Sequence, residues 1–240
     1  MALPARLPIR QRLSDTVAED LARAVVSGRI AVGATLPSEP ELVAGFGISK
    51  VVVREAIVAL QAAGLVTVKQ GKRTTVLDEG AWDVLSPMVQ QAIRAEGRGH
   101  SLLRQLHEAR LIVEPAAAAL SAERASPIRV AELSVLADRL GEIATGSRDL
   151  AEFLAVDRAF HDVVAWACEN VALRAMMRDL HRYMSFNWED SRILRSELPM
   201  LAEHHRRVFD AIAARDPDAA RNAMLEHISW ASRIETERAT

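Results

Sequence analysis

Apolar residues recur every three or four positions along most of the chain, which is the spacing of one face of an α-helix. The first such stretch predicts a helix over residues 14–27. Two shorter helices are predicted to begin at Ser38 and Ser49, because each serine can cap a helix and each helix ends at glycine. Two short helices joined by a tight turn make a helix-turn-helix.

The hydrophobic pattern changes after residue 64. Two runs rich in β-forming residues, 65–69 and 74–77, flank a basic tip that contains glycine, which predicts a hairpin. Residues 78–87 are polar and end in Ser-Pro, as a linker does, and the helical spacing then returns to near the end of the chain. We therefore predict a mainly α fold: a winged helix-turn-helix at 1–77, a linker at 78–87 and an all-helical antiparallel bundle at 88–240.

The charges divide along the same boundary. The chain as a whole has a net charge of −2, but residues 1–77 carry ten Lys/Arg against six Asp/Glu, and the remainder carries twenty against twenty-six. A basic segment joined to an acidic one suggests that the first part meets a polyanion. The single cysteine, Cys168, and the lack of a long apolar run or signal peptide predict a cytoplasmic protein that does not enter a membrane.

The third predicted helix carries two cations on one face, Lys50 and Arg54, while Val53, Ile57 and Leu60 would pack inward. A helix of this kind fits the major groove of DNA, where arginine can hold a guanine edge through two hydrogen bonds. Either cation taken alone would equally fit the solvated side of an amphipathic helix. The helix order and the basic hairpin favour DNA, and the residues assigned to it are Ser38, Ser49, Lys50, Arg54, Lys69, Gln70, Gly71, Lys72 and Arg73.

Four metal-ligating residues are spaced so that they can meet in the helical bundle. Asp157 and His161 lie one turn apart on one helix, and His205 and His227 lie equally far before and after Asp216 at a predicted helix turn. One carboxylate and three imidazoles suit a divalent transition metal such as zinc, nickel or manganese. Scattered, unrelated polar residues are the alternative. His204 is expected at the surface, and no partner set is evident for His181.

A fifth polar residue, Arg110, stands in an otherwise apolar helix, where it could capture a carboxylate or form an internal ion pair with Glu114 one turn later. Asn187 is a further candidate for lining the same pocket.

Several runs resemble one family. Leu36-Pro37-Ser38-Glu39, Gly47-Ile48-Ser49-Lys50, Val53-Arg54-Glu55-Ala56 and Gly64-Leu65-Val66 look like the winged-helix signature of GntR-type regulators. Glu108-Ala109-Arg110 and Glu114-Pro115-Ala116-Ala117 look like the opening of the FadR-like ligand-binding (FCD) domain. Two positions depart from the family: Pro40 and Lys50 stand where it has arginine, and lysine lacks the bidentate fork.

The resemblance implies a homodimeric repressor that binds an inverted repeat in operator DNA and is released by a small organic or sugar acid. Many domains of this kind carry an Asp, a His four residues later and two further His, in the order of Asp157, His161, His205 and His227, and the resemblance favours Arg110 as a ligand contact. The runs at 82–85 and 112–115 resemble galactonate-responsive regulators.

Two other functions compete with this one. His161-Asp162 is similar to the metal-binding dipeptide of helical phosphohydrolases, so a metal-dependent hydrolase is the alternative. The other is an architectural DNA-binding protein without a ligand. The chain has no phosphate-binding loop and no nucleophile motif, so we predict that it is not an enzyme.

Overall fold

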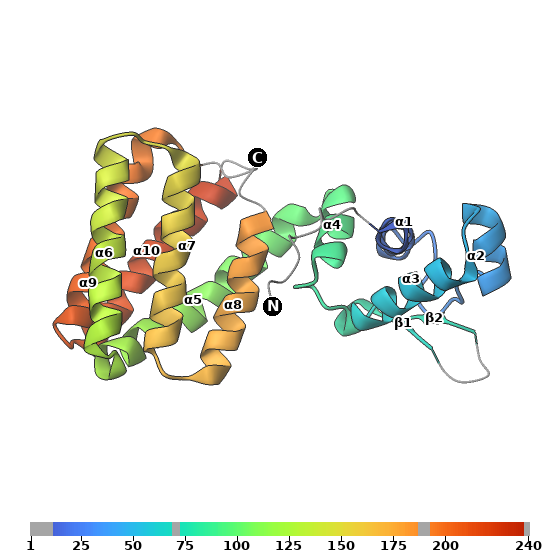
Figure 1. Cartoon of the computed structure of the whole chain (residues 1–240), viewed down its shortest axis with the longest axis horizontal. Coiled ribbons are helices and arrows are strands. Elements are labelled where there is room, and N and C mark those ends of the chain that lie inside the picture. Colours follow the sequence, from blue (N-terminus) through green and yellow to red (C-terminus); the bar gives the residue numbers. More distant parts are fainter. Residues whose placement is uncertain (1–11, 69–72, 187–192, 238–240) are drawn as a thin grey trace, which may run out of the picture. The chain divides into compact units, whose positions relative to one another are not determined.

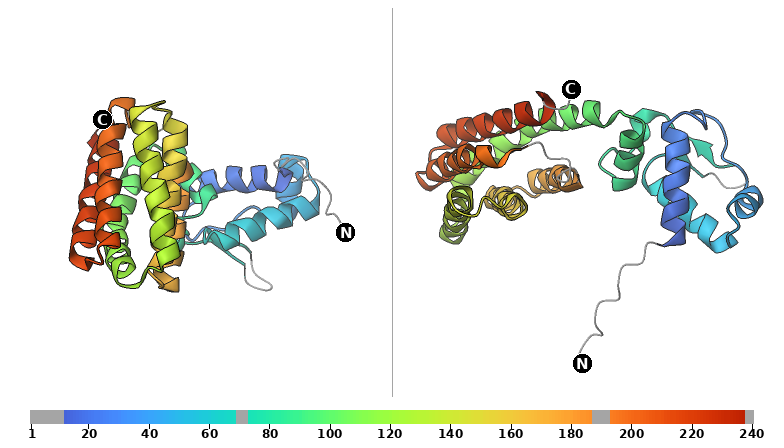
Figure 2. Two further views of the ribbon diagram at one scale, coloured as in Figure 1. Left: turned by 60° about the vertical axis from the view of Figure 1, so that its left-hand side comes forward. Right: turned by 90° about the horizontal axis from the view of Figure 1, so that it is seen from above.

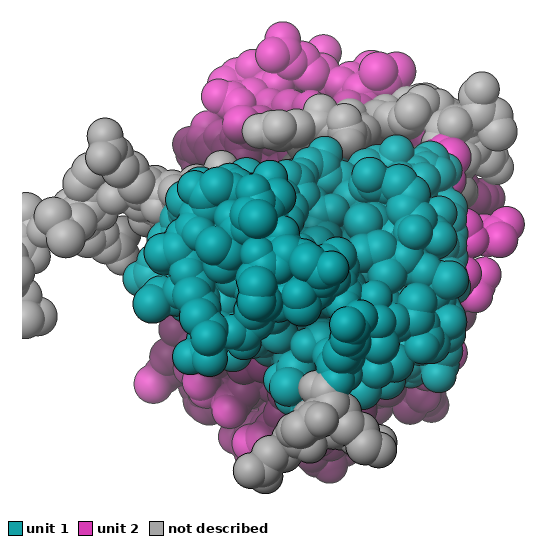
Figure 3. All heavy atoms as spheres, turned by 90° about the vertical axis from the view of Figure 1, so that its right-hand side faces the viewer, with its two compact units in different colours: residues 1–99 teal, residues 100–240 magenta. Residues whose placement is uncertain are grey.

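The computed structural model describes residues 12–68, 73–186 and 193–237. The chain forms two compact units, residues 1–99 and residues 100–240 (Figure 1, Figure 3). Each unit has its own buried core. Among the described helices, none is long and apolar enough to cross a membrane.

The first unit is built on three helices, α1 (Leu13–Val26), α2 (Glu39–Phe46) and α3 (Lys50–Ala62). Both α1 and α2 pack against α3. Each serine cap forms as expected: the Ser38 side chain accepts from the backbone N–H of Glu41, and the Ser49 side chain accepts from that of Val52. The predicted helix-turn-helix is confirmed.

The hairpin that follows has two short antiparallel strands, β1 (Val66–Thr67) and β2 (Thr75–Val76), with Val66 opposite Val76. Gly64 turns the chain from α3 into β1 at φ +71°. A Cβ built on Gly64 would lie 2.0 Å from the backbone oxygen of Ala81, so only glycine fits this turn.

The segment after the hairpin is more structured than a linker. It holds the 3₁₀ turn η1 (Glu79–Ala81), and helix α4 (Pro87–Ala95) then packs against α1. The apolar side of α4, with Val89, Ala92 and Ile93, is buried. Because this apolar stripe needs cover, α4 lies in the first compact unit, which ends at Gly99, whereas the sequence predicted a DNA-binding domain at 1–77 and a bundle from 88.

The second unit is a helical bundle of α5 (Gly99–Arg124), α6 (Pro127–Thr145), α7 (Leu150–Ala167), α8 (Val171–Phe186), α9 (Leu198–Ala213) and α10 (Pro217–Glu237), with a 3₁₀ turn η3 (Arg195–Glu197) before α9. Helix α9 packs against α6 and α10, α7 packs on α6, and α8 packs on α7 (Figure 2). The mainly α fold class is confirmed.

Helix α5 joins this core through small residues. Ala118 and Ala122 are fully buried in the main apolar cluster, and the Ser121 hydroxyl donates to the backbone oxygen of Val164 on α7 at 2.9 Å. This packing brings polar residues of α5 next to those of α7, α9 and α10. Cys168 is fully buried, as a core residue should be.

Candidate DNA-binding face and metal site

The two cations of the recognition helix α3 share one partner. The Arg54 Nε lies 3.2 Å from both carboxylate oxygens of Glu39, and the Lys50 Nζ lies 3.5 Å from one of them. The hydrogen bond from Arg54 lowers the pKa of the Glu39 carboxyl. Both cations are well exposed, so they are accessible to a polyanion while Glu39 holds their positions. The sequence analysis did not foresee this partner.

The other predicted DNA contacts divide into two groups. Ser38 and Ser49 lie at the starts of α2 and α3, and Arg73 is exposed before β2. Four residues of the hairpin tip lie outside the described residues: Lys69, Gln70, Gly71 and Lys72.

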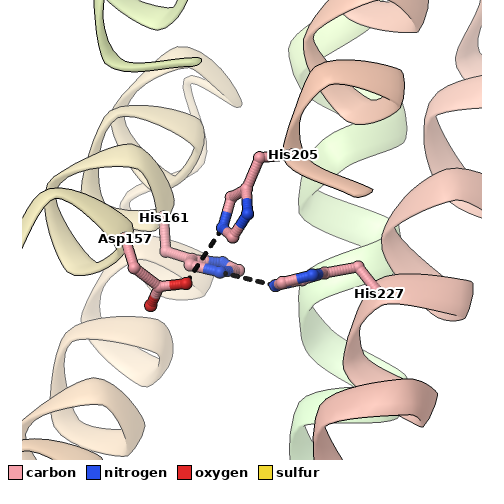
Figure 4. A group of neighbouring side chains, drawn as sticks. All are labelled: Asp157, His161, His205 and His227. Carbon is pink, nitrogen blue, oxygen red and sulfur yellow. Dashed lines mark hydrogen bonds and ion pairs between the residues drawn. The ribbon is translucent and has the colours of Figure 1, made fainter. Parts of the chain in front are cut away.

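The four predicted metal ligands come together in the bundle (Figure 4). Asp157 and His161 come from α7, His205 from α9 and His227 from α10. Each offers one ligand atom, and these atoms all lie within 4.8 Å of one another. The three histidines are buried. As the spacing predicted, Asp157 and His161 lie one turn apart on α7, and His205 and His227 face each other across the α9–α10 hairpin.

The protonation of His205 leaves a lone pair facing a carboxylate. Its Nδ1 lies 2.8 Å from the backbone oxygen of Leu201, and a carbonyl can only accept, so Nδ1 carries the proton. The other nitrogen, Nε2, lies 3.0 Å from the Asp157 Oδ1. When His205 is neutral, the lone pair of its Nε2 therefore faces the Asp157 Oδ1, and the two acceptors repel each other. A cation bound between them would remove this repulsion.

The spacing of the nitrogens also fits a shared cation. His161 Nε2 and His227 Nε2 lie 3.1 Å apart. Two imidazole nitrogens bound to one tetrahedral zinc ion, each at about 2.1 Å, would be about 3.4 Å apart, close to this distance. Among the described residues, the buried His205 Nε2 makes no hydrogen bond, although it lies close to Asp157 Oδ1. The buried cluster could therefore hold a metal ion.

Burial and neighbouring charges shift the pKa of Asp157, His161 and His227. Burial lowers the pKa of His161, and burial together with His205 and His161 lowers the pKa of His227 well below its ordinary value. Burial alone would raise the pKa of Asp157, but the protonated form of His205, which can donate to it, holds that pKa below the usual range. Neutral imidazoles beside an ionised carboxylate are the form that binds a divalent metal.

A second buried group lies next to the ligands. Glu114 on α5 is fully buried and approaches Arg110, His161 and His181. The ion pair between Arg110 and Glu114 forms, since the Arg110 Nε lies 2.5 Å from Glu114 Oε1, and the Arg110 side chain also lines the cavity beside the metal ligands. The cavity also includes Arg158 and His181 and has a volume of about 40 Å³.

His204 was expected at the surface, but it is only 8% exposed, because its ring packs against His227 and Trp230. His181 does have partners, Glu114 and Asp162, which come from other helices and leave no spacing signal in the sequence. Asn187 lies outside the described residues.

A winged helix-turn-helix followed by a helical bundle with a buried polar site defines a transcriptional regulator of two functional units. Residues 13–76 match the gntR family of bacterial regulatory proteins, and residues 105–229 match the FCD domain. The chain therefore belongs to the GntR family, in its FadR-like subfamily with a C-terminal FCD domain. This membership excludes the hydrolase alternative.

Known proteins resemble the chain over nearly its whole length. It is 28% identical to the galactonate operon transcriptional repressor of Escherichia coli strain K12, over 92% of this chain and 95% of that one. It is 31% identical to the HTH-type transcriptional repressor NanR of Citrobacter rodentium, over 93% and 85% respectively. Among solved structures, Streptococcus agalactiae GntR superposes with a TM-score of 0.50 at 26% identity, over 92% of this chain and all of that one.

Proposed function

We propose that this protein is a repressor whose operator binding is released when a small carboxylic acid binds at a metal held by Asp157, His161, His205 and His227. The observation that carries the proposal is the convergence of these four ligand atoms within 4.8 Å of one another, beside a cavity that Asp157, His161, His227 and Arg110 line. A divalent transition metal bound there would supply a positive charge with positions open to a carboxylate oxygen.

The residues of the cavity select an anion. Arg110 and Arg158 both line it, so two guanidinium groups stand beside the metal ligands. Arginine binds a carboxylate through paired hydrogen bonds. A cavity of about 40 Å³ accepts an ion and a few waters, which the carboxylate end of an acid would replace.

A sugar acid is the effector class we favour. The repressor of the galactonate operon is similar to this chain over almost all of both proteins, and its name connects it to a sugar acid. Asn187 is proposed to contact the same effector.

The DNA contacts are proposed to come from α2, α3 and the hairpin. Arg54 and Lys50 would face the major groove, and Lys69, Gln70, Gly71, Lys72 and Arg73 would follow the backbone or the minor-groove rim. The capping serines, Ser38 and Ser49, would lie close to phosphates. One such unit makes a small interface, so we propose a homodimer on an inverted repeat.

The experiment that tests the proposal uses an operator selected from a random DNA pool and measures its binding by fluorescence anisotropy. Galactonate added to the zinc-loaded protein should weaken DNA binding. Arg110→Met should raise the galactonate concentration needed, while the matched change Arg104→Met, at an exposed position of the same helix, should not. Release that is unaffected by Arg110→Met would contradict this pocket.

A further inference from the structure

Glu114 on α5 is a fully buried carboxylate that is not one of the four proposed metal ligands. Its two oxygens face different groups. Oε1 lies 2.5 Å from the Arg110 Nε and 3.2 Å from the His181 Nε2, and Oε2 lies 2.7 Å from the His161 Nδ1. A buried charge with several partners is costly to maintain unless each partner is satisfied.

The contact with His161 matches what Leu201 does for His205. There, a backbone oxygen accepts from Nδ1 and leaves Nε2 to face Asp157. At His161 a carboxylate oxygen lies 2.7 Å from Nδ1 as an ion-pair contact, and Nε2 faces His227. A carboxylate behind a histidine ligand fixes the tautomer and the ring direction and increases the basicity of the coordinating nitrogen.

The contact with Arg110 acts on the anion-binding side. Because Nε is held by Glu114, the plane of the guanidinium is fixed while the side chain still lines the cavity. An arginine held in this way loses less conformational freedom when it binds a carboxylate.

A second metal ion at Glu114, His161 and His181 is the competing explanation, since these three could also offer ligand atoms within reach of one another. The geometry argues against it. The fixed positive charge of Arg110 already lies on Oε1, and His161 would have to lose both ring protons to serve two ions.

We propose that Glu114 is a positioning residue shared by both halves of the site, holding His161 toward the metal through one oxygen and Arg110 toward the acid through the other. This inference rests on the proposed function, because it assumes that His161 is a ligand. It adds that one carboxylate on α5 organises metal binding and acid binding together.

The test compares zinc binding by the full-length protein and by Glu114→Gln, measured by competition with a chromophoric chelator. Loss of an outer partner of a metal ligand lowers affinity about 10–100-fold, which is the decrease we expect. The matched control is Glu123→Gln, an exposed glutamate on the same helix, which should bind zinc as the wild type does.

A second measurement separates positioning from general damage. Long-range ¹H–¹⁵N spectra of the metal-free proteins report the tautomer of each histidine. His161 should be protonated at Nδ1 in the wild type and in Glu123→Gln, and should become a tautomer mixture in Glu114→Gln, while His205 stays unchanged. If Glu114→Gln fails to fold because Arg110 loses its ion pair with Glu114, Arg110→Met/Glu114→Gln is compared with Arg110→Met instead.

The outcomes are distinguishable. Zinc affinity and the His161 tautomer that both survive Glu114→Gln would overturn the positioning role. Two zinc ions per wild-type chain, with one lost in Glu114→Gln, would overturn it in favour of a second metal site. A wild-type chain that binds no zinc would refute the metal part of the proposed function, and the tautomer of His161 would still decide whether Glu114 positions it.

Discussion

The substitution Asp157→Asn should change stability in opposite directions with and without metal. In the metal-free protein, Asp157 Oδ1 faces the His205 Nε2 at 3.0 Å while Nδ1 of the same ring is held by the Leu201 oxygen. Neutral His205 therefore offers no proton to the carboxylate. Asparagine has nearly the same shape and supplies an amide N–H that can donate to Nε2.

The gain in the metal-free protein is that of one new hydrogen bond. A typical intramolecular hydrogen bond contributes about 0.5–1.5 kcal/mol to the free energy of unfolding. For a chain of this size, about 1 kcal/mol corresponds to a rise in Tm of roughly 2–4 °C. Asp157→Asn should therefore melt slightly higher than the wild type when no metal is present.

With metal the order should reverse. Zinc at 100 times its Kd stabilises the wild type by about 2.7 kcal/mol. A variant that has lost a charged ligand, and binds at least about 100-fold more weakly, gains only about 0.4 kcal/mol at the same concentration. With the new hydrogen bond of about 1 kcal/mol included, the free energy of unfolding of the variant in zinc is about 1.3 kcal/mol lower than that of the wild type.

The assay is thermal unfolding followed by circular dichroism, with chelator and with zinc, on both proteins. A structural Asp–His ion pair without a metal role predicts a different result, because removing one charge of a buried pair destabilises the protein. A lower Tm for Asp157→Asn in chelator, and the same deficit in zinc, would refute the metal-site reasoning.

Four further predictions concern the metal ligands and the first unit. Because burial lowers the pKa of His227, metal should stay bound at pH 7 and leave only as falling pH protonates the ligands, which a zinc-release titration measures. Arg54→Ala should cost about 1–3 kcal/mol of operator affinity at one base position. Glu39→Gln should strengthen binding to all DNA sequences. Fluorescence anisotropy titrations measure both effects. Gly64→Ala should destabilise the first unit by more than about 1 kcal/mol in denaturant unfolding, because its Cβ meets the Ala81 oxygen.

The sequence predicted those features that depend on local spacing. The helix starts at Ser38 and Ser49 and the level placement of His205 and His227 each follow from residue type and distance along one helix or one hairpin. These are short-range rules, and the structure confirms the elements that they predicted.

The features that the sequence analysis missed join residues from separate helices. Glu39 meets Arg54 across the helix-turn-helix, and His181 meets Glu114 across α8 and α5. No periodicity links such pairs, since their distance is set by how helices pack rather than by their own pattern. The surface position predicted for His204 was wrong for the same reason. The His204 side chain points away from the ligand His205 on α9, as predicted, but its ring packs against His227 on α10.

The position of the site along α5 connects it to the DNA-binding unit through the chain itself. Helix α5 begins at Gly99, where the first compact unit ends, and it carries both Arg110 and Glu114. Arg110 lies eleven residues from Gly99, about 16 Å along one helix. On the proposed function, an acid that contacts Arg110 acts directly on α5, and a metal bound by His161 on α7 acts on α5 through the contact of His161 with Glu114. Thermodynamic linkage then requires that operator DNA weaken acid binding by the same factor by which the acid weakens DNA binding, which paired titrations of the full chain can measure.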